Sequence, residues 1–521
     1  MLLFVWRATI DLANVRPLSG DEVVILSITE RLLQHGRLGT PMLEGFRGAD
    51  DHYFVVLPGQ NVWQLPFVTV FGMNVAAARL ASVLAAAFTI AIGAALAWLW
   101  FGHVTAGLSA LLLVMWRSGA ADMDYGLPLL SVARSARYDI SLVAWLVAAV
   151  LFLELWLRRP AGSRAFAAGA ATGFAALTQF LGFFALPALV VTRTAARPLT
   201  VRGFLPWLVV GFLCALLPYG IFAGMHASDA AAQFFTAHAA RVELGFGGVT
   251  APLAGVAREP MRYLAALRTL GFGPWLYVIG TIPAFIVTVV LARSDAATAG
   301  RGTRVLVPLT ITMVVQLALL EPTKAPVYGL VLYPFVCIVV ARVLAHAFSL
   351  WTARRNRLAG GLAGLVLTLI VAEGAAVYVH DARAAPDIAR YADIGLAIDH
   401  AASEPGAILG TPRWWWALRD RGYVPLWSAD MRWVDANRRT GRAEPFVDVL
   451  RREGIRYVLV TAGLRADAAR GHMQLAAPVS TLHDTCGPSF PIGDFNGYGR
   501  LELIEVDRSC LEALAPGAPA R

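Results

Sequence analysis

Long apolar runs alternate with short polar links over the first 380 residues of the chain. A helix needs about 20 apolar residues to cross a bilayer, so this alternation predicts a polytopic membrane protein. Eleven runs are candidates: residues 1–10, 77–101, 104–121, 139–157, 165–178, 180–192, 204–224, 271–292, 305–320, 326–349 and 358–379. The runs 165–178 and 180–192 are short, and we predict that they dip to one face and return as two passes. The first run is too short to cross, so we expect a mis-assigned start or a missing part of the first helix.

The charges of the links predict an orientation. Arginine gathers in the links 158–164, 193–202, 293–304 and 354–357. Arg-rich short loops face the cytoplasm, so these links are predicted to be inside. The loops at 11–76 and 225–270 and the tail from 381 are then predicted to be extracytoplasmic.

The composition is typical of a membrane protein, and it offers an explanation of the positive net charge other than nucleic-acid binding. Hydrophobic residues make up 57% of the 521 residues and charged residues 15%, against about 25% charged in soluble domains. Mean hydropathy is +0.60. Much of the net charge of +9 lies in the orienting links, so it does not indicate nucleic-acid binding. Lys324 is the single lysine among 44 basic residues.

The tail at 381–521 has a different pattern. Apolar runs of strand length occur at 407–409, 456–461 and 501–506, and a helical pattern at 446–453 precedes the second of them. Alternating strands and helices predict a small α/β domain with a disordered end. Cys486 and Cys510 lie in this tail and can pair if it faces an oxidising compartment.

Two groups of acids lie in the first predicted outer loop. Asp21 and Glu22 directly precede an amphipathic helix predicted at 23–35, which we expect to lie on the membrane surface. Asp21 is either a functional carboxylate or the N-cap of that helix. The other group, Asp50-Asp51-His52, is either a metal site or simply solvated.

Five motifs occur in an order that resembles a known family. Asp21-Glu22 comes first, then Phe71-Gly72 with Ala78-Arg79-Leu80, Arg137-Tyr138-Asp139, Leu177-Thr178-Gln179, and Lys324-Ala325-Pro326-Val327-Tyr328 with Pro334. They resemble, over residues 1–350, the GT-C superfamily of membrane glycosyltransferases, and most of all its family 39 group. The resemblance implies a transmembrane glycosyltransferase domain at 1–380, in the inner membrane of a bacterium.

The resemblance also implies chemistry and partners. The donor would be a polyprenyl-phosphate sugar drawn from membrane lipid, and the acceptor an envelope glycan, lipid or protein. Asp21 would be the base, and Glu22 would assist it or hold a divalent cation, although no metal site is assigned. The predicted donor-phosphate ligands are Lys324, Arg137, Asp139 and Arg241.

Each of these residues also has a structural interpretation. Glu22 suits the first turn of a helix, Arg137 and Asp139 suit a local ion pair, and Lys324 suits an interfacial position. A transporter or flippase of a lipid-linked glycan is the alternative function, and a non-catalytic scaffold is a third. A transporter should place charges along a path through several spans, whereas these ionisable residues are predicted to gather at one face.

Overall fold

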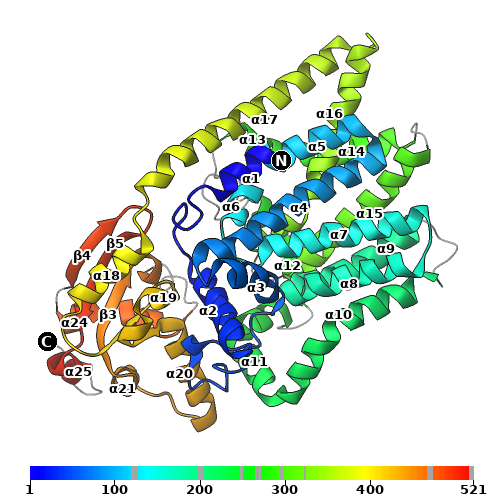
Figure 1. Cartoon of the computed structure of the whole chain (residues 1–521). Helices are drawn as coiled ribbons and strands as arrows, with labels where there is room; N and C mark the ends of the chain where they lie inside the picture. Colours follow the sequence, from blue (N-terminus) through cyan, green and yellow to red (C-terminus); the bar gives the residue numbers. More distant parts are fainter. Residues whose placement is uncertain are drawn as a thin grey trace.

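The computed structural model describes most of the chain. The residues that it describes are 1–118, 127–196, 203–246, 250–264, 267, 271–293, 297–321, 324–465, 473–480, 482–487 and 489–514. A helical bundle contains the first three-quarters of the chain, and a smaller unit with a β-sheet follows it (Figure 1).

Helices make up the bundle. Their bounds are α1 Leu2–Thr9, α2 Gly20–His35, α3 Gly59–Phe71, α4 Val75–Phe101, α5 His103–Met115, α6 Pro128–Ala133, α7 Asp139–Arg158, α8 Gly162–Thr178, α9 Ala185–Ala196, α10 Leu205–Met225, α11 Ala227–Phe246, α12 Thr250–Leu264, α13 Phe272–Trp275, α14 Thr281–Leu291, α15 Ala297–Leu320, α16 Tyr333–Thr352 and α17 Arg357–Ala384. Short 3-10 turns, η1 Pro41–Leu43, η3 Phe180–Phe184 and η7 Pro326–Val331, and a π-helical turn, η6 Leu276–Gly280, link some of them.

Seven helical segments among the described residues are long and apolar enough to cross a membrane: Val75–Phe101, Asp139–Arg158, Leu205–Met225, Phe272–Leu291, Gly300–Leu320, Tyr333–Thr352 and Arg357–Ala401. Each overlaps one of the eleven predicted runs. The other four runs correspond to shorter helices, α1, α5, α8 and α9. The polytopic helical class is therefore confirmed, while the number of eleven passes stays a prediction.

The carboxyl-terminal unit is built on a mixed sheet of five strands in the order β2-β1-β3-β5-β4. Strands β1 (Ala407–Gly410), β2 (Tyr423–Pro425) and β3 (Ile455–Thr461) are parallel. Strands β4 (Phe490–Phe495) and β5 (Gly499–Glu505) complete an antiparallel edge. The three predicted strands and the predicted helix, α21 Phe446–Arg452, are confirmed, and β2 and β4 were not predicted.

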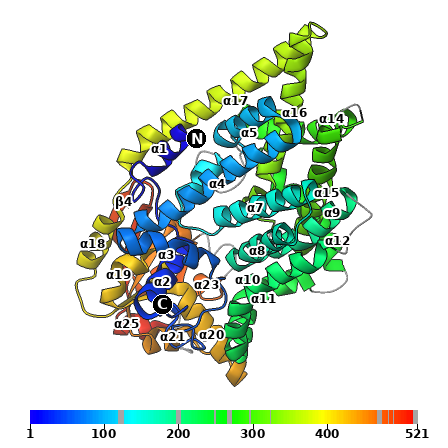
Figure 2. The ribbon, with the colours of Figure 1, turned by 45° about the vertical axis from the view of Figure 1, so that its right-hand side comes forward.

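The remaining helices of this unit surround the sheet: α18 Tyr391–Ala401, α19 Trp415–Leu418, α20 Leu426–Thr440, α23 Ala476–Ser480, α24 Leu482–Cys486 and α25 Arg508–Ala513, with 3-10 turns η8 Ala385–Asp387, η9 Pro412–Trp414 and η10 Arg419–Arg421. Helix α17 runs along one side of the bundle and leads directly into this unit (Figure 2).

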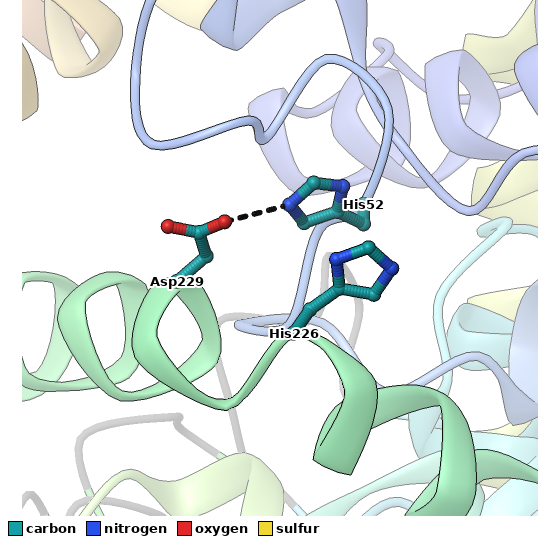
Figure 3. Close-up of side chains that lie close together, drawn as sticks. All are labelled: His52, His226 and Asp229. Carbon is teal, nitrogen blue, oxygen red and sulfur yellow. Dashed lines mark hydrogen bonds and ion pairs between the residues drawn. The ribbon is translucent and has the colours of Figure 1, made fainter.

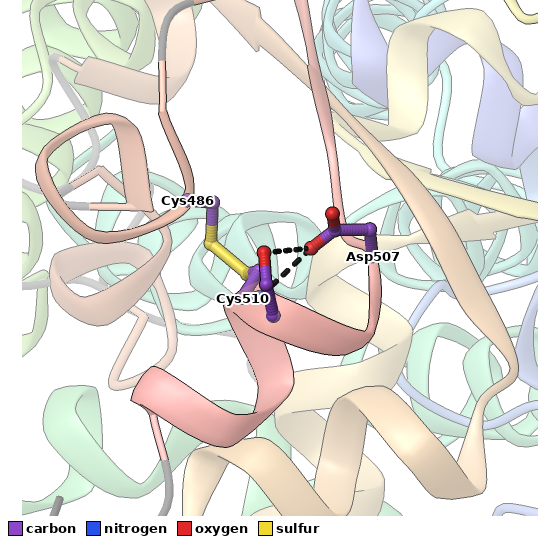
Figure 4. Close-up of a disulfide and its surroundings, with 4 residues drawn as sticks. Cys486, Asp507 and Cys510 are labelled. Carbon is purple, nitrogen blue, oxygen red and sulfur yellow. Dashed lines mark hydrogen bonds between the residues drawn. A yellow bond between two sulfur atoms is a disulfide. The ribbon is translucent and has the colours of Figure 1, made fainter.

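A disulfide joins two helices of the carboxyl-terminal unit. Cys486 at the end of α24 pairs with Cys510 in α25 (Figure 4), with their Cα atoms 4.5 Å apart. Asp507 caps α25, because its carboxylate accepts a hydrogen bond from the backbone N–H of Cys510. The sequence left open whether these two cysteines pair; in the structure they do, at a sequence separation of 24 residues.

Helix α2 lies between the bundle and the carboxyl-terminal unit (Figure 1). One hydrophobic core contains Val23, Leu26 and Ile28 of α2 together with Trp414 and Trp415 of the carboxyl-terminal unit. Helix α2 is therefore packed between protein surfaces, whereas it was predicted to rest on the membrane. Trp414 and Trp415 are buried and fill this core.

Candidate active site

The first turn of α2 fixes where its two acids point. Ser19 is the N-cap: its side-chain oxygen accepts from the backbone N–H of Glu22, and the Glu22 carboxylate accepts from the N–H of Ser19. This reciprocal capping box satisfies two helix-terminal N–H groups. The cap interpretation of Asp21 is therefore wrong, because Ser19 holds that position and leaves Asp21 free to face outward.

Glu22 connects α2 to two other parts of the bundle. Its side chain is 1% exposed. The Arg79 guanidinium donates to both carboxylate oxygens, at 2.9 and 3.1 Å, and the backbone N–H of Ala136 donates to one of them at 2.7 Å. With the Ser19 contact, each Glu22 oxygen accepts two hydrogen bonds.

This environment makes Glu22 a structural anion. Burial by itself would raise the pKa of the Glu22 carboxyl, but the Arg79 charge and hydrogen bonds from Arg79, Ala136 and Ser19 lower it overall. A carboxylate with four donors has no oxygen left for a metal ion, so the Asp21–Glu22 pair does not fit a cation site. Glu22 also holds α2 against the segment that carries Arg137, through the backbone N–H of Ala136, and its part in assisting the base stays a prediction.

Arg79 is a site residue whose part the sequence did not reveal. It is completely buried, and it also donates to the backbone carbonyls of Leu12 and Arg16, in the segment before α2. The signal was present as the Ala78-Arg79-Leu80 motif, but nothing in the sequence showed that its partner was Glu22.

Asp21, Arg137 and Asp139, here called the Asp21 group, come together at the α2 end of the bundle. The Arg137 guanidinium donates through Nε to Asp139 at 3.0 Å, and its Nη2 lies 3.4 Å from the Asp21 carboxylate. The Asp21 side chain is 57% exposed, and that of Asp139 is buried. One guanidinium thus faces two carboxylates, and the exposed carboxylate is free to meet a substrate.

Tyrosines form the surroundings of this group. Tyr53 and Tyr138 lie close enough to Asp21 for its charge to raise their pKa values, and Tyr138 and Tyr328 lie close enough to Arg137 to raise its pKa. Burial, together with the nearby Asp21 charge, raises the pKa of Tyr53 and of Tyr138 well above 10. Their hydroxyls therefore remain protonated at neutral pH and are available as donors.

The carboxyl-terminal unit borders the site. The hydroxyl of Tyr498 accepts from the backbone N–H of Leu18, and Pro412 lies directly beside Gly20. Further out, Arg47 pairs with Asp435 at 2.8 Å and Arg419 pairs with Glu30 at 2.6 Å. This unit therefore holds the segment on which Asp21 is carried.

The structure places Lys324 in a different group. Its residue is 8% exposed. The ammonium group donates to the carbonyls of Leu317 and Ala318, at 3.0 and 2.7 Å, and pairs with Glu259 at 3.2 Å. Burial lowers the pKa of Lys324, and the Glu259 contact offsets this in part.

Arg262 completes this buried group. It pairs with Glu259 at 2.8 Å and with Glu321 at 2.9 Å, and it donates to the carbonyl of Ala325. Glu259, Arg262, Glu321 and Lys324, here called the Lys324 cluster, hold two cations and two anions. All three ammonium protons of Lys324 are used, so in this arrangement it offers none to a phosphate.

The other predicted residues have separate places. The Arg241 side chain lies outside the described residues. Asp51 of the predicted acidic group pairs with Arg31 and Arg37. Two further acids are also paired: Glu373 with Arg117 at 3.2 Å, and Glu154 with Arg158 at 2.7 Å.

Comparison with solved structures identifies the fold. ArnT from Cupriavidus metallidurans bound to undecaprenyl phosphate is similar at 17% identity over 98% of each chain, with a TM-score of 0.59. The oligosaccharyltransferase of Archaeoglobus fulgidus in its apo form is similar at 11% identity over 92% of this chain and 72% of that one, with a TM-score of 0.54. These likenesses show that the chain shares the fold of these two proteins, a polytopic helical bundle with a smaller carboxyl-terminal unit. No protein-family model and no curated protein sequence matches the chain.

Proposed function

We propose that this protein is a membrane glycosyltransferase that moves a sugar from a polyprenyl-phosphate carrier to an envelope acceptor. The observation that carries the proposal is the Asp21–Arg137–Asp139 group, which lies at one end of a GT-C bundle with its first carboxylate exposed. The likeness to ArnT, whose structure holds undecaprenyl phosphate, supports a lipid-phosphate donor.

The reaction needs a base and a cation, and the group supplies both. Asp21 accepts a hydrogen bond from the acceptor hydroxyl and takes its proton as the new glycosidic bond forms. The bond between the sugar and the carrier phosphate breaks, and the phosphate leaves with an added negative charge. Arg137 stabilises that charge, and Asp139 orients the guanidinium through its 3.0 Å contact.

Arg137 has donors to spare for this task. A guanidinium carries five N–H groups. Within the described residues, Nε donates to Asp139 and Nη2 makes a long contact with Asp21. A phosphate at Nη1 and Nη2 would replace that long contact, which frees the Asp21 oxygens for the acceptor.

We infer the face of the membrane from the arginine-rich links. Short links of this kind favour the cytoplasmic side, so we propose that Asp21 and the carboxyl-terminal unit are extracytoplasmic in a bacterial inner membrane. The Cys486–Cys510 disulfide supports this, because disulfides persist in oxidising compartments.

The test compares Asp21→Asn with Asp11→Asn, a second exposed aspartate in the same segment. A strain lacking the protein is complemented with each variant, and its envelope glycans are measured by mass spectrometry. We expect a sugar that is missing in the deletion strain to return with Asp11→Asn and to fall at least about 100-fold with Asp21→Asn. Purified Asp21→Asn should still bind undecaprenyl phosphate.

Two results would contradict the proposal. Full restoration by Asp21→Asn would remove Asp21 from the chemistry and favour transport of a lipid-linked glycan. An unchanged glycan profile in the deletion strain, together with no binding of undecaprenyl phosphate to the wild-type protein, would reject the transferase assignment itself.

A further inference from the structure

Two histidines and an aspartate meet away from the Asp21 group. His52 belongs to the loop before α3, His226 ends α10, and Asp229 lies in the first turn of α11 (Figure 3). The Nε2 atom of His52 lies 3.1 Å from the Asp229 carboxylate, and the two imidazole rings stack with centroids 4.1 Å apart. One ligand atom from each residue lies within 4.8 Å of the other two.

The surrounding backbone holds His52 in this place. The Gln233 amide nitrogen donates to the carbonyls of Arg47 and His52, and its oxygen accepts from the N–H of Phe54. Gly48 has a positive φ of 66°, and a Cβ there would lie 2.6 Å from the His52 ring. Gln233, itself completely buried, thus fastens the loop to α11 with His52 over Asp229.

We propose that His52, His226 and Asp229 bind a zinc ion. Two imidazoles and a carboxylate are a ligand set that zinc favours, and three protein ligands leave a fourth position open to water. Ligand atoms around a tetrahedral zinc lie about 3.3 Å apart at the usual bond lengths. The three side chains are partly exposed, so small rotations can close the present spacing.

The ion would act as a clamp between elements far apart in the sequence. His52 and Asp229 are 177 residues apart, and the loop that carries His52 also carries Arg47, which pairs with Asp435. Zinc would therefore secure α11 to the first loop, and through that loop to the carboxyl-terminal unit. Tyr53, the next residue after His52, borders the Asp21 group.

Metal binding to the purified full-length protein in detergent tests this proposal. Zinc content after loading and dialysis is measured by mass spectrometry, zinc affinity by calorimetry, and ligand type by the visible absorption of a cobalt-loaded sample. The variants are His226→Ala and Asp229→Asn, with His35→Ala, an exposed histidine at the end of α2, as the matched control. Gln233→Ala tests the support that positions His52.

We expect about one zinc per chain in the wild type and in His35→Ala. Affinity should fall at least about 100-fold in His226→Ala, and about 10-fold in Gln233→Ala, since loss of an outer-shell partner costs 10- to 100-fold. Thermal unfolding of His226→Ala and Asp229→Asn without metal should match that of the wild type without metal, which shows that the fold is intact. A wild type that retains no zinc, or a His226→Ala variant that binds as the wild type does, would overturn the proposal and leave only a hydrogen bond between His52 and Asp229.

Discussion

The Asp21 group and the Lys324 cluster use the same chemical groups in opposite ways. The Lys324 cluster balances two anions with two cations, and its side chains are buried. The Asp21 group sets two carboxylates against one guanidinium, and Asp21 is largely exposed. Both come from motifs that resemble one family, so the motifs alone do not tell them apart.

The difference shows what distinguishes a reactive site from a structural one. Charged groups that are fully paired and hydrogen-bonded hold elements together, and removing one partner of a buried pair lowers the stability of the fold strongly. A charge with unused oxygens or protons at an exposed position can interact with a substrate. On this criterion we propose that Asp21 and Arg137 are the reactive pair, and that Lys324 and Glu22 hold the fold together.

The largest expected effect separates the two groups by stability. Arg262→Met removes a buried cation and leaves Glu259 and Glu321 with Lys324 alone. We expect a loss of about 3–5 kcal/mol in the free energy of unfolding, measured by denaturation in detergent micelles. Arg258→Met, an exposed position on the same helix, should change it by less than about 0.5 kcal/mol. Equal effects of the two variants would show that the cluster adds no stability.

Glu22→Gln should lower the free energy of unfolding by about 1.5–3 kcal/mol, the usual contribution of hydrogen bonds to a charged group. The direction of the pKa shift decides how this contribution to stability changes with pH. The folded-state pKa of Glu22 is lowered, so its contribution is present above the unfolded value of about 4.3 and disappears as pH falls through the folded value. The melting temperatures of wild type and Glu22→Gln should therefore converge below about pH 4. A constant gap would contradict the charged role of Glu22.

Arg137→Ala should weaken binding of undecaprenyl phosphate about 10- to 100-fold, because a charge-assisted contact to phosphate is lost. Calorimetry on the purified protein measures this directly. Arg137→Lys keeps the charge but loses the fork that Asp139 orients, and we expect an intermediate affinity. Unchanged affinity in both variants would place the donor phosphate elsewhere.

The smallest effect is expected for donor binding by Lys324→Met. The ammonium group is already saturated, so affinity for undecaprenyl phosphate should stay within about twofold when corrected for the folded fraction. A tenfold loss with a normal melting temperature would instead restore the predicted phosphate role of Lys324 and imply that the cluster opens on binding.

Local patterns predicted most of the architecture. The apolar runs, the strands at 407, 455 and 501, and the helix before Gly454 follow from hydrophobicity and stop signals within a few residues. Strand β2 has three residues and β4 contains a proline, so neither gave a strand pattern. The sequence predicted that α2 lies on the membrane, but it packs against the carboxyl-terminal unit. An amphipathic pattern shows that one face of a helix is covered, and it does not show whether lipid or protein covers that face.

The sequence predicted which residues are candidates for the site, but not which of them contact one another. Asp21, Arg137 and Asp139 do meet, in agreement with their order in the resemblance. The Glu22–Arg79 pair and the burial of Lys324 depend on elements far apart in sequence. A single sequence shows which charged groups exist, while packing decides which of them neutralise one another.

The hydrogen bond between Tyr498 and Leu18 bears on how deletion experiments are designed. Leu18 lies three residues before Asp21. Removing the carboxyl-terminal unit therefore also releases the backbone segment that positions the Asp21 carboxylate. A truncated protein without transferase activity would then reflect a displaced Asp21 as readily as the loss of any other contribution from the carboxyl-terminal unit. Single replacement of Tyr498 by Phe, with the remainder intact, distinguishes the two causes.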